Sequence, residues 1–139
     1  MSLRSKSREF AMQMLFQWDM SHQDVKKLEL KFWKSAKAAD HTRTFANQLF
    51  EGASEHSGAL DELITKHAEN WRLERLAAID RAILRLAIHE MRDTNTPAKV
   101  IINEAVELAK KFSTDDAGGF VNGILDGYRK SLKEIPAAE

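Results

Sequence analysis

The sequence predicts an all-α protein of about seven helices. Apolar residues recur at the three- and four-residue spacing of a buried helix face along most of the chain. No segment shows the sustained apolar and polar alternation that is typical of a half-buried strand. The joins between the periodic segments are short, which favours a helix bundle.

The predicted helices follow one another along the chain. Ser5 or Ser7 can cap a first helix that reaches about Met20. Asp24 can cap the second helix, whose apolar positions lie at helical spacing. The polar, Ala-rich segment 35–41 is expected to form a loop.

The middle of the chain is expected to form one long helix at about 42–69. Gly52 and Gly58 are places where this helix could bend or where a neighbouring helix could approach closely. A short connector at 70–73 follows. Strong apolar periodicity then predicts a central helix at about 75–92.

The last two predicted helices lie on either side of a polar turn at 113–116. Thr96 is placed to cap the first of them and Pro97 to occupy its first position, where the missing N–H costs nothing. That helix ends near Phe112, and the last helix reaches about Lys133. The prediction is one domain over 1–135, with an N-terminal half at about 1–70, a C-terminal half at about 71–135 and a tail at 136–139.

Composition and charge limit the classes of function. The 21 basic and 21 acidic residues cancel, which argues against a polyanion-binding surface over the whole molecule but allows a local basic patch. The absence of cysteine excludes disulfides and thiolate metal sites and is typical of a reducing compartment. The N-terminus lacks an apolar signal core and no apolar run could span a bilayer, so we expect a cytoplasmic protein without a membrane partner.

No residue pattern indicates an enzyme. The histidines are scattered, and His89-Glu90 lacks the second histidine that a zinc-protease helix needs. Gly118-Gly119 has neither a phosphate-loop lysine nor a preceding strand. The sequence therefore predicts a binding protein with no catalytic residue, metal or cofactor.

Two segments are candidates for RNA contact. Arg4, Lys6 and Arg8 alternate ahead of the first helix, where they could follow a phosphate backbone or simply form a charged terminus without a role. The second segment, at the start of the last helix, comprises Asp116, Gly118, Gly119 and Phe120. Aspartate suits a helix N-terminus and the glycines leave amides uncovered for a phosphate. The aromatic ring could stack on a base or could equally close the core.

Asn122 and Gly123 are unfavourable neighbours inside a helix. They predict either close helix packing with a satisfied buried amide or a direct ligand contact. We assign Asn103, Asn122 and Gly123 structural roles, and we expect Asn122 to be buried and hydrogen-bonded to a neighbouring helix.

Four segments, in this order, resemble the NusB family of bacterial transcription antitermination factors over nearly the whole chain. They are the residues 8–18 (REFAMQMLFQW), 79–90 (IDRAILRLAIHE), 100–110 (VIINEAVELAK) and 120–123 (FVNG). The resemblance implies two three-helix bundles packed perpendicular to each other. Family members carry Ser or a basic residue around 117–119, whereas this chain has Ala-Gly-Gly, so only the backbone and Phe120 are expected to contact RNA there.

The resemblance also implies function and partners. NusB-like proteins bind RNA through an Arg-rich N-terminal stretch. They also bind a small ribosomal protein, which is called NusE when it acts in antitermination. Together they hold boxA RNA and deliver it, with other Nus factors, to the elongating RNA polymerase, which also supports ribosomal RNA transcription. Phe16 occupies the position of a family aromatic that touches NusE, and Glu74, Asp80 and Arg81 match charged family positions. Phe16, Glu74 and Asp80 are expected to lie together on the surface.

Two alternatives to this function can be compared with the sequence. A helical module of this kind could act as a homodimeric adaptor without RNA binding. The same module also forms the N-terminal part of ribosomal RNA cytosine methyltransferases, but those enzymes need a cysteine nucleophile that this sequence lacks.

Overall fold

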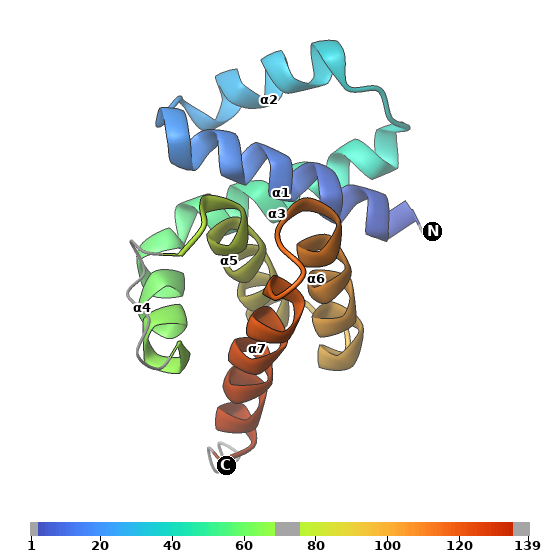
Figure 1. Cartoon of the computed structure of the whole chain (residues 1–139). Helices are drawn as coiled ribbons and strands as arrows, with labels where there is room; N and C mark the ends of the chain where they lie inside the picture. The colour runs from blue at the N-terminus through green and yellow to red at the C-terminus, as the bar shows by residue number, and fades with distance from the viewer. Residues whose placement is uncertain (1–2, 69–75, 135–139) are drawn as a thin grey trace, which may run out of the picture.

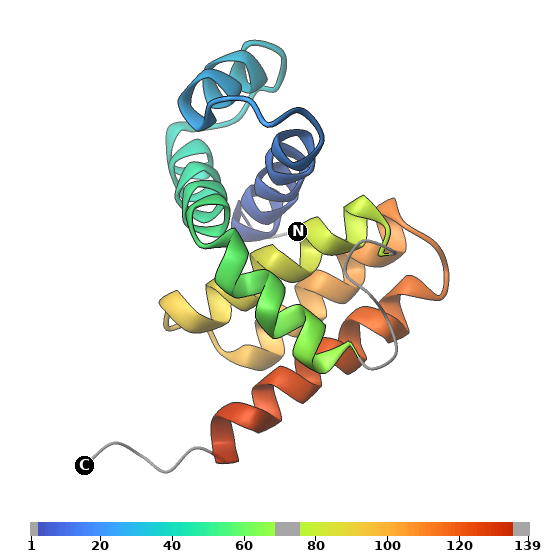
Figure 2. The ribbon, with the colours of Figure 1, turned by 90° about the vertical axis from the view of Figure 1, so that its left-hand side faces the viewer.

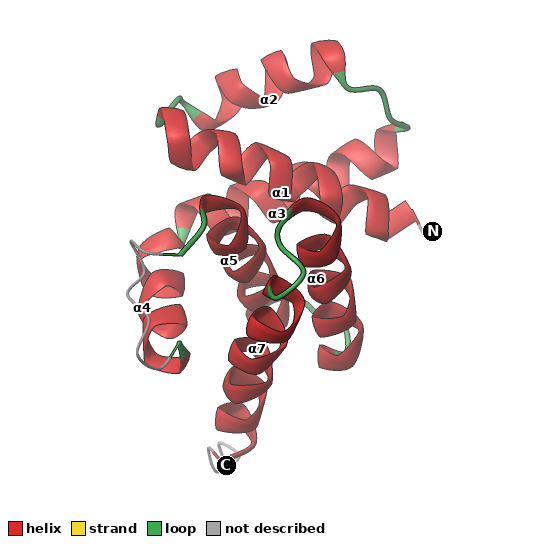
Figure 3. Cartoon of the chain, in the orientation of Figure 1, coloured by secondary structure: helices red, strands yellow, loops and turns green. Residues whose placement is uncertain are grey.

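A computed structural model describes residues 3–68 and 76–134, which form helices and no strand (Figures 1 and 3). Among these residues the all-α prediction and the expected number of helices are confirmed. The helices are α1 (Leu3–Ser21), α2 (Val25–Ser35), α3 (Asp40–Glu55), α4 (Ser57–His67), α5 (Ala78–Asp93), α6 (Ala98–Phe112) and α7 (Ala117–Glu134).

The helices form two groups that pack across each other (Figures 1 and 2). One group contains α1, α2 and α3, and the other contains α4 to α7. Helix α5 is central because it packs against α1, α3, α4, α6 and α7. Its buried apolar residues, including Ile83, Leu84 and Ile88, join the two groups in one continuous core.

Helix α1 begins earlier than expected. It starts at Leu3, so Ser5 and Ser7 lie within the helix instead of capping it. The Ser7 hydroxyl donates to the carbonyl of Thr42 on α3 (2.9 Å), and the Ser5 hydroxyl donates to Glu104 on α6. These contacts hold the N-terminal turn of α1, with its basic residues, against α3 and α6.

Helix α2 has the predicted cap. The Lys27 amide donates to the Asp24 carboxylate at 3.2 Å. Its inner face packs through Phe32 and Trp33, whose rings meet edge to face with centroids 4.9 Å apart and both of which contact Phe10 of α1. Edge-to-face contacts of this kind add to the gain from apolar burial.

The single long helix expected at 42–69 is wrong. The chain leaves the helical conformation at His56, which has φ −102° and ψ 18°, and α4 starts in a new direction. The break lets the apolar face of α4, with Leu60 and Ile64 fully buried, pack against α5 and α7. Gly52 has a different role, because a Cβ there would lie 2.2 Å from two atoms of the His89 ring on α5.

The start of α6 lies one residue beyond the prediction. Pro97 is the cap residue and Ala98 the first helical residue, and no side chain caps the helix. Thr96 does not cap α6, since its amide and hydroxyl both contact the Thr94 hydroxyl in the preceding loop. Helix α7 begins at Ala117, as the turn at 113–116 predicted.

Candidate nucleic-acid and partner interfaces

The predicted role of Arg8 as an accessible cation is wrong. Its residue is 4% exposed, and its guanidinium group forms a bidentate ion pair with Glu90 of α5, at 2.6 and 2.8 Å. A third contact reaches Glu104 of α6 at 2.9 Å. Burial lowers the pKa of Arg8, but the bonds to Glu90 and Glu104 outweigh burial and raise it. Arg8 therefore joins three helices and has no side available for a phosphate.

Arg4 and Lys6 remain accessible at the start of α1. The Arg4 guanidinium lies 4.4 Å from the centre of the Phe45 ring, which fixes an exposed cation against an aromatic face. Lys6 pairs with the buried carboxylate of Glu9 at 3.1 Å, and Lys111 of α6 pairs with the other oxygen of Glu9 at 2.8 Å. Burial raises the pKa of Glu9, but the interactions with Lys111 and Lys6 together outweigh burial and lower it.

The end of α6 contributes residues that sequence reasoning missed. Lys110 and Lys111 are exposed, and the Lys111 ammonium lies 5.3 Å from the centre of the Phe112 ring. The aliphatic stem of Lys110 lies against Gly118, where a Cβ would be 3.4 Å away. The signal in the sequence that could have indicated them is the Lys-Lys-Phe run at the end of a predicted helix.

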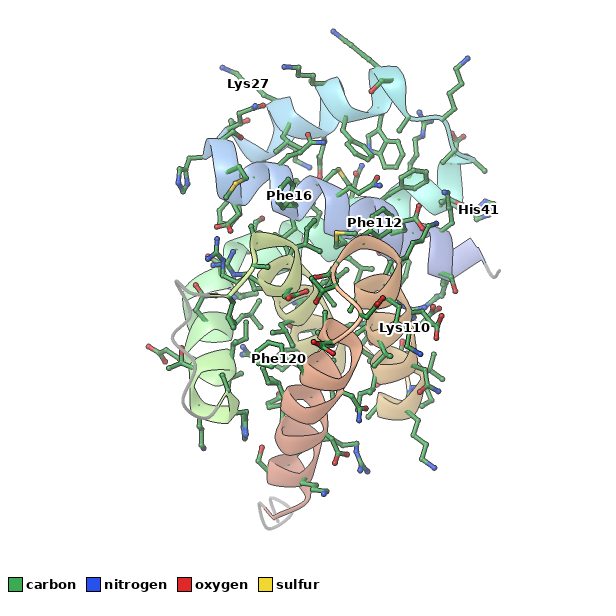
Figure 4. The ribbon with its side chains drawn as sticks, in the orientation of Figure 1. Phe16, Lys27, His41, Lys110, Phe112 and Phe120 are labelled. Atoms are coloured by element: carbon green, nitrogen blue, oxygen red, sulfur yellow. The ribbon has the colours of Figure 1, made fainter. Side chains whose placement is uncertain are left out.

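Phe120 lies in the first turns of α7, where it is partly exposed and also packs against the core. It lines a hollow of about 270 Å³ together with Asp80 and Asp116. Gly119 is exposed, with nothing within 4 Å of the position of a Cβ. Figure 4 shows Phe112, Lys110 and Phe120 around the turn that joins α6 to α7. The two predicted RNA segments are therefore linked through the end of α6.

Asp80 is not on the surface, which corrects its predicted position. It is 8% exposed, and its Oδ1 atom has no hydrogen-bond partner among the described residues. Burial raises the pKa of Asp80, and a bond from Ser113 opposes this only in part. Asp80 lines the hollow beside the turn between α6 and α7, whereas its neighbour Arg81, about 100° further round α5, contacts α1.

Arg81 faces α1 instead. Its guanidinium group donates to Asp19 at 2.9 Å, and Phe16 lies one helical turn before Asp19 on α1. Arg85 holds the same carboxylate at 3.0 Å and also binds Asp61 of α4 at 2.6 Å. Phe16 is partly exposed at this corner. The structure thus brings Phe16 and Arg81 to one region, while the adjacent Asp80 is buried and Glu74 lies outside the described residues.

The structural roles predicted for three further residues are wrong. Asn103 and Asn122 are exposed, so neither amide is buried between helices. A Cβ at Gly123 would meet nothing within 4 Å, so no close approach requires glycine there. These residues lie on outward faces of α6 and α7, because the apolar stripes of the two helices are rotated away from them, with Val121 and Leu125 fully buried.

Comparison with known proteins places this arrangement in a family. The model of the NusB family matches residues 5–130. The chain belongs to the NusB family. Transcription antitermination protein NusB of Koribacter versatilis is 47% identical over 131 residues, which is 93% of this chain and 90% of that protein. NusB of Nitratiruptor is 41% identical over 96% of both chains.

Solved structures of the NusB family share the fold. T. maritima NusB superposes with a TM-score of 0.81 at 34% identity, covering 91% of this chain and 90% of that one. A chain from the crystal structure of antitermination factors NusB and NusE in complex with dsRNA superposes with a TM-score of 0.82 at 28% identity. That match covers 94% of this chain and 98% of the other.

Two further features bear on the site. None of the described helices is both long and apolar enough to span a membrane. The described residues also contain no cluster of three or more His, Asp or Glu side chains placed to hold a metal ion. The chemistry that this surface offers is ionic contact, hydrogen bonding and aromatic stacking.

Proposed function

We propose that this protein is a non-enzymatic, cytoplasmic RNA-binding factor of transcription antitermination. It binds boxA-type single-stranded RNA together with NusE and delivers the RNA to elongating RNA polymerase through other Nus factors. Membership of the NusB family supports this function, as does the likeness to a chain solved with NusE and RNA.

The observation that carries the proposal is a set of cations beside aromatic rings on α1 and at the end of α6. Arg4 lies over Phe45 and Lys111 over Phe112, with Lys6 and Lys110 close to them in sequence, and the partly exposed Phe120 follows on α7. Cations along a path neutralise phosphates, and rings beside them stack on unpaired bases. This combination is typical of a surface for single-stranded RNA.

The surface is held rigid by buried charges. Arg8 ties α1 to α5 and α6, and Glu9 holds Lys6 and Lys111 from two helices close together. A site whose groups are already in place loses less entropy on binding. Arg8 therefore supports RNA binding by positioning its neighbours.

NusE is proposed to bind beside Phe16 at the corner of α1 and α5. The partly exposed ring lies next to the ion pairs of Asp19 with Arg81 and Arg85. An aromatic anchor beside fixed charges suits a protein interface, in which the charges mainly set orientation and on-rate. Glu74 belongs to this proposal from the family resemblance.

The test compares RNA binding with and without NusE at two salt concentrations. The variant Arg4→Gln/Lys110→Gln removes two exposed cations and leaves the Glu9 ion pairs intact. Its affinity for boxA RNA should fall, and its salt slope should decrease by roughly 0.7 for each phosphate that is no longer neutralised. Lys66→Gln/Lys99→Gln, which removes two exposed lysines elsewhere, is the matched control.

Two results would argue against the proposal. Equal affinity losses in both variants would show that only net charge matters. A stable dimer that binds neither RNA nor NusE would favour the homodimeric adaptor.

A further inference from the structure

Helix α2 carries a concentration of positive charge in a chain whose net charge is zero. Lys27, Lys31 and Lys34 follow one another at spacings of four and three residues, which places them along one face of the helix. All three are exposed, and none takes part in an ion pair with another described residue. The only acidic residue of α2, Glu29, is buried on the inner side.

The charges on the neighbouring side of α2 are already balanced. Lys26 pairs with Glu51 of α3 at 2.8 Å and with Glu29 at 3.6 Å. Arg43 pairs with Asp40 at 2.6 Å. On α2 itself, the positive charge that remains uncompensated is therefore that of the row Lys27, Lys31 and Lys34, and the exposed Lys37 in the loop that follows adds to it.

A hollow of about 760 Å³ lies beside this row, between α2 and α3. Trp33 lines it, and the indole N–H of Trp33 donates to the Asn47 side chain at 2.8 Å, which fixes the orientation of the ring. Leu30, also in the lining, is 71% exposed. Lys34 belongs to both the row and the hollow, so cations and an oriented aromatic ring adjoin each other.

This surface is separate from the proposed boxA site. Helix α1 lies between α2 and the turn that joins α6 to α7 (Figure 1), and Lys27 extends from the outer side of α2 (Figure 4). The aromatic groups also differ, since Phe112 and Phe120 belong to the boxA site and Trp33 to the hollow.

Three polyanionic partners would match the charge, and the other features favour one of them. A membrane surface would need a free apolar face, but the apolar face of α2 is buried through Leu28 and Phe32. An acidic protein would use the lysines but would not need a fixed aromatic ring beside them. Single-stranded RNA uses both, because its phosphates pair with lysines and its bases stack on aromatic rings.

We propose that α2 is a second contact surface for single-stranded RNA, in which Lys27, Lys31 and Lys34 bind phosphates and Trp33 stacks on a base. The contact is independent of sequence, since neither ionic nor stacking contacts distinguish bases strongly. Its natural ligand is then RNA that flanks the segment held at the boxA site. The inference goes beyond the proposed function and does not depend on NusE.

The test uses the full chain with its tryptophans replaced by 5-fluorotryptophan, and a twelve-residue oligouridine as the probe. The fluorine resonance of Trp33 is assigned with Trp33→Phe. Oligouridine should shift this resonance in the unmodified sequence. In Lys27→Gln/Lys31→Gln/Lys34→Gln the shift should vanish, and the salt slope should decrease by about 2, or roughly 0.7 per phosphate contact. Gln has nearly the helix propensity of Lys, so α2 should stay folded, which circular dichroism checks.

Two comparisons decide the outcome. The matched control, Lys66→Gln/Lys99→Gln/Lys130→Gln, should keep the Trp33 shift and most of the salt slope. The Arg4→Gln/Lys110→Gln variant should also keep the Trp33 shift, even though its boxA binding is weakened, so the two proposals can fail separately. An unmoved Trp33 resonance, or an equal effect in both triple variants, would overturn the inference. A polyglutamate of equal charge that shifts Trp33 as strongly as oligouridine would assign the surface to an acidic protein instead.

Discussion

Arg8 of α1 and Glu90 of α5 form a bidentate ion pair in the interior, with Nη2 to Oε2 at 2.6 Å and Nε to Oε1 at 2.8 Å. The Glu90 side chain is 1% exposed and that of Arg8 is 5% exposed. The pair joins the two groups of helices at the point where the proposed RNA surface begins. Arg8 therefore stabilises the packing of the two helix groups, whereas Arg4 and Lys6 do not.

Replacing Arg8 should therefore destabilise the fold. Arg8→Ala leaves the buried Glu90 carboxylate without a counter-charge, which typically costs about 3–5 kcal/mol. Urea denaturation measures the change in the free energy of unfolding. Arg43→Ala is the control, because it removes an exposed ion pair with Asp40 and should cost only about 0–1 kcal/mol. Similar losses in both variants would contradict the structural importance of the buried pair.

Gly52 should be intolerant of any side chain. Gly52→Ala places a Cβ about where the His89 ring lies, at 2.2 Å from Cε1 and Nε2, so the buried ring or the two helices must shift. Overpacking of this kind typically costs about 1–3 kcal/mol. In His89→Ala the same glycine substitution should cost much less, and this non-additivity can be measured by thermal unfolding of the four proteins in the cycle. Gly58→Ala is the control, because nothing lies within 4 Å of its Cβ position.

Stability should fall as the pH rises through neutrality because of Glu29. Burial and the neighbouring Glu51 carboxylate raise the pKa of Glu29 to about 7. A carboxyl whose folded pKa is raised contributes stability that is complete below its ordinary pKa of 4.5 and is lost as the pH passes through about 7. When the pH is raised from 5 to 8, the free energy of unfolding should fall less for Glu29→Gln than for the unmodified protein.

Glu51 provides the internal check on that pH dependence. Its own pKa is lowered, with the bond to Glu29 as the largest cause, so its contribution changes below pH 4.5 and outside this window. Glu51→Gln removes a negative charge beside Glu29 and should move the Glu29 transition to lower pH. Chemical denaturation at a series of pH values measures both effects. An identical slope in all three proteins would show that Glu29 does not titrate in this range.

Phe120 should matter more for RNA binding than for folding. Its ring is partly exposed beside a hollow, so Phe120→Ala should lower RNA affinity by roughly 1–3 kcal/mol, the value of one stacked base. Its loss of stability should stay below the roughly 3–5 kcal/mol that is typical of a fully buried phenylalanine. Phe50→Ala is the comparison, since Phe50 is fully buried and remote in sequence from the RNA segments. A large drop in melting temperature with unchanged RNA affinity would return Phe120 to the core.

The positions of the helices could largely be predicted from the sequence, because a helix depends on contacts between residues three and four apart. The cap at Asp24, the turn at 113–116 and the end of α6 near Phe112 were all visible in this way. The break at His56 was visible only in part, because Gly58 indicated a possible bend but nothing local showed that the helix ends there. The packing of α4 against α5 and α7 decides it.

The sequence by itself therefore determined the all-α class, most helix boundaries and, through the order of its motifs, the family. The tertiary structure alone decided which charges are available. Arg8 resembled Arg4 and Lys6 until the fold placed it beside Glu90, 82 residues away. Asn122 was predicted to be buried, but the orientation of α7 leaves its side chain exposed to solvent. The physical reason is that the availability of a charge depends on contacts between distant segments, which local periodicity does not encode.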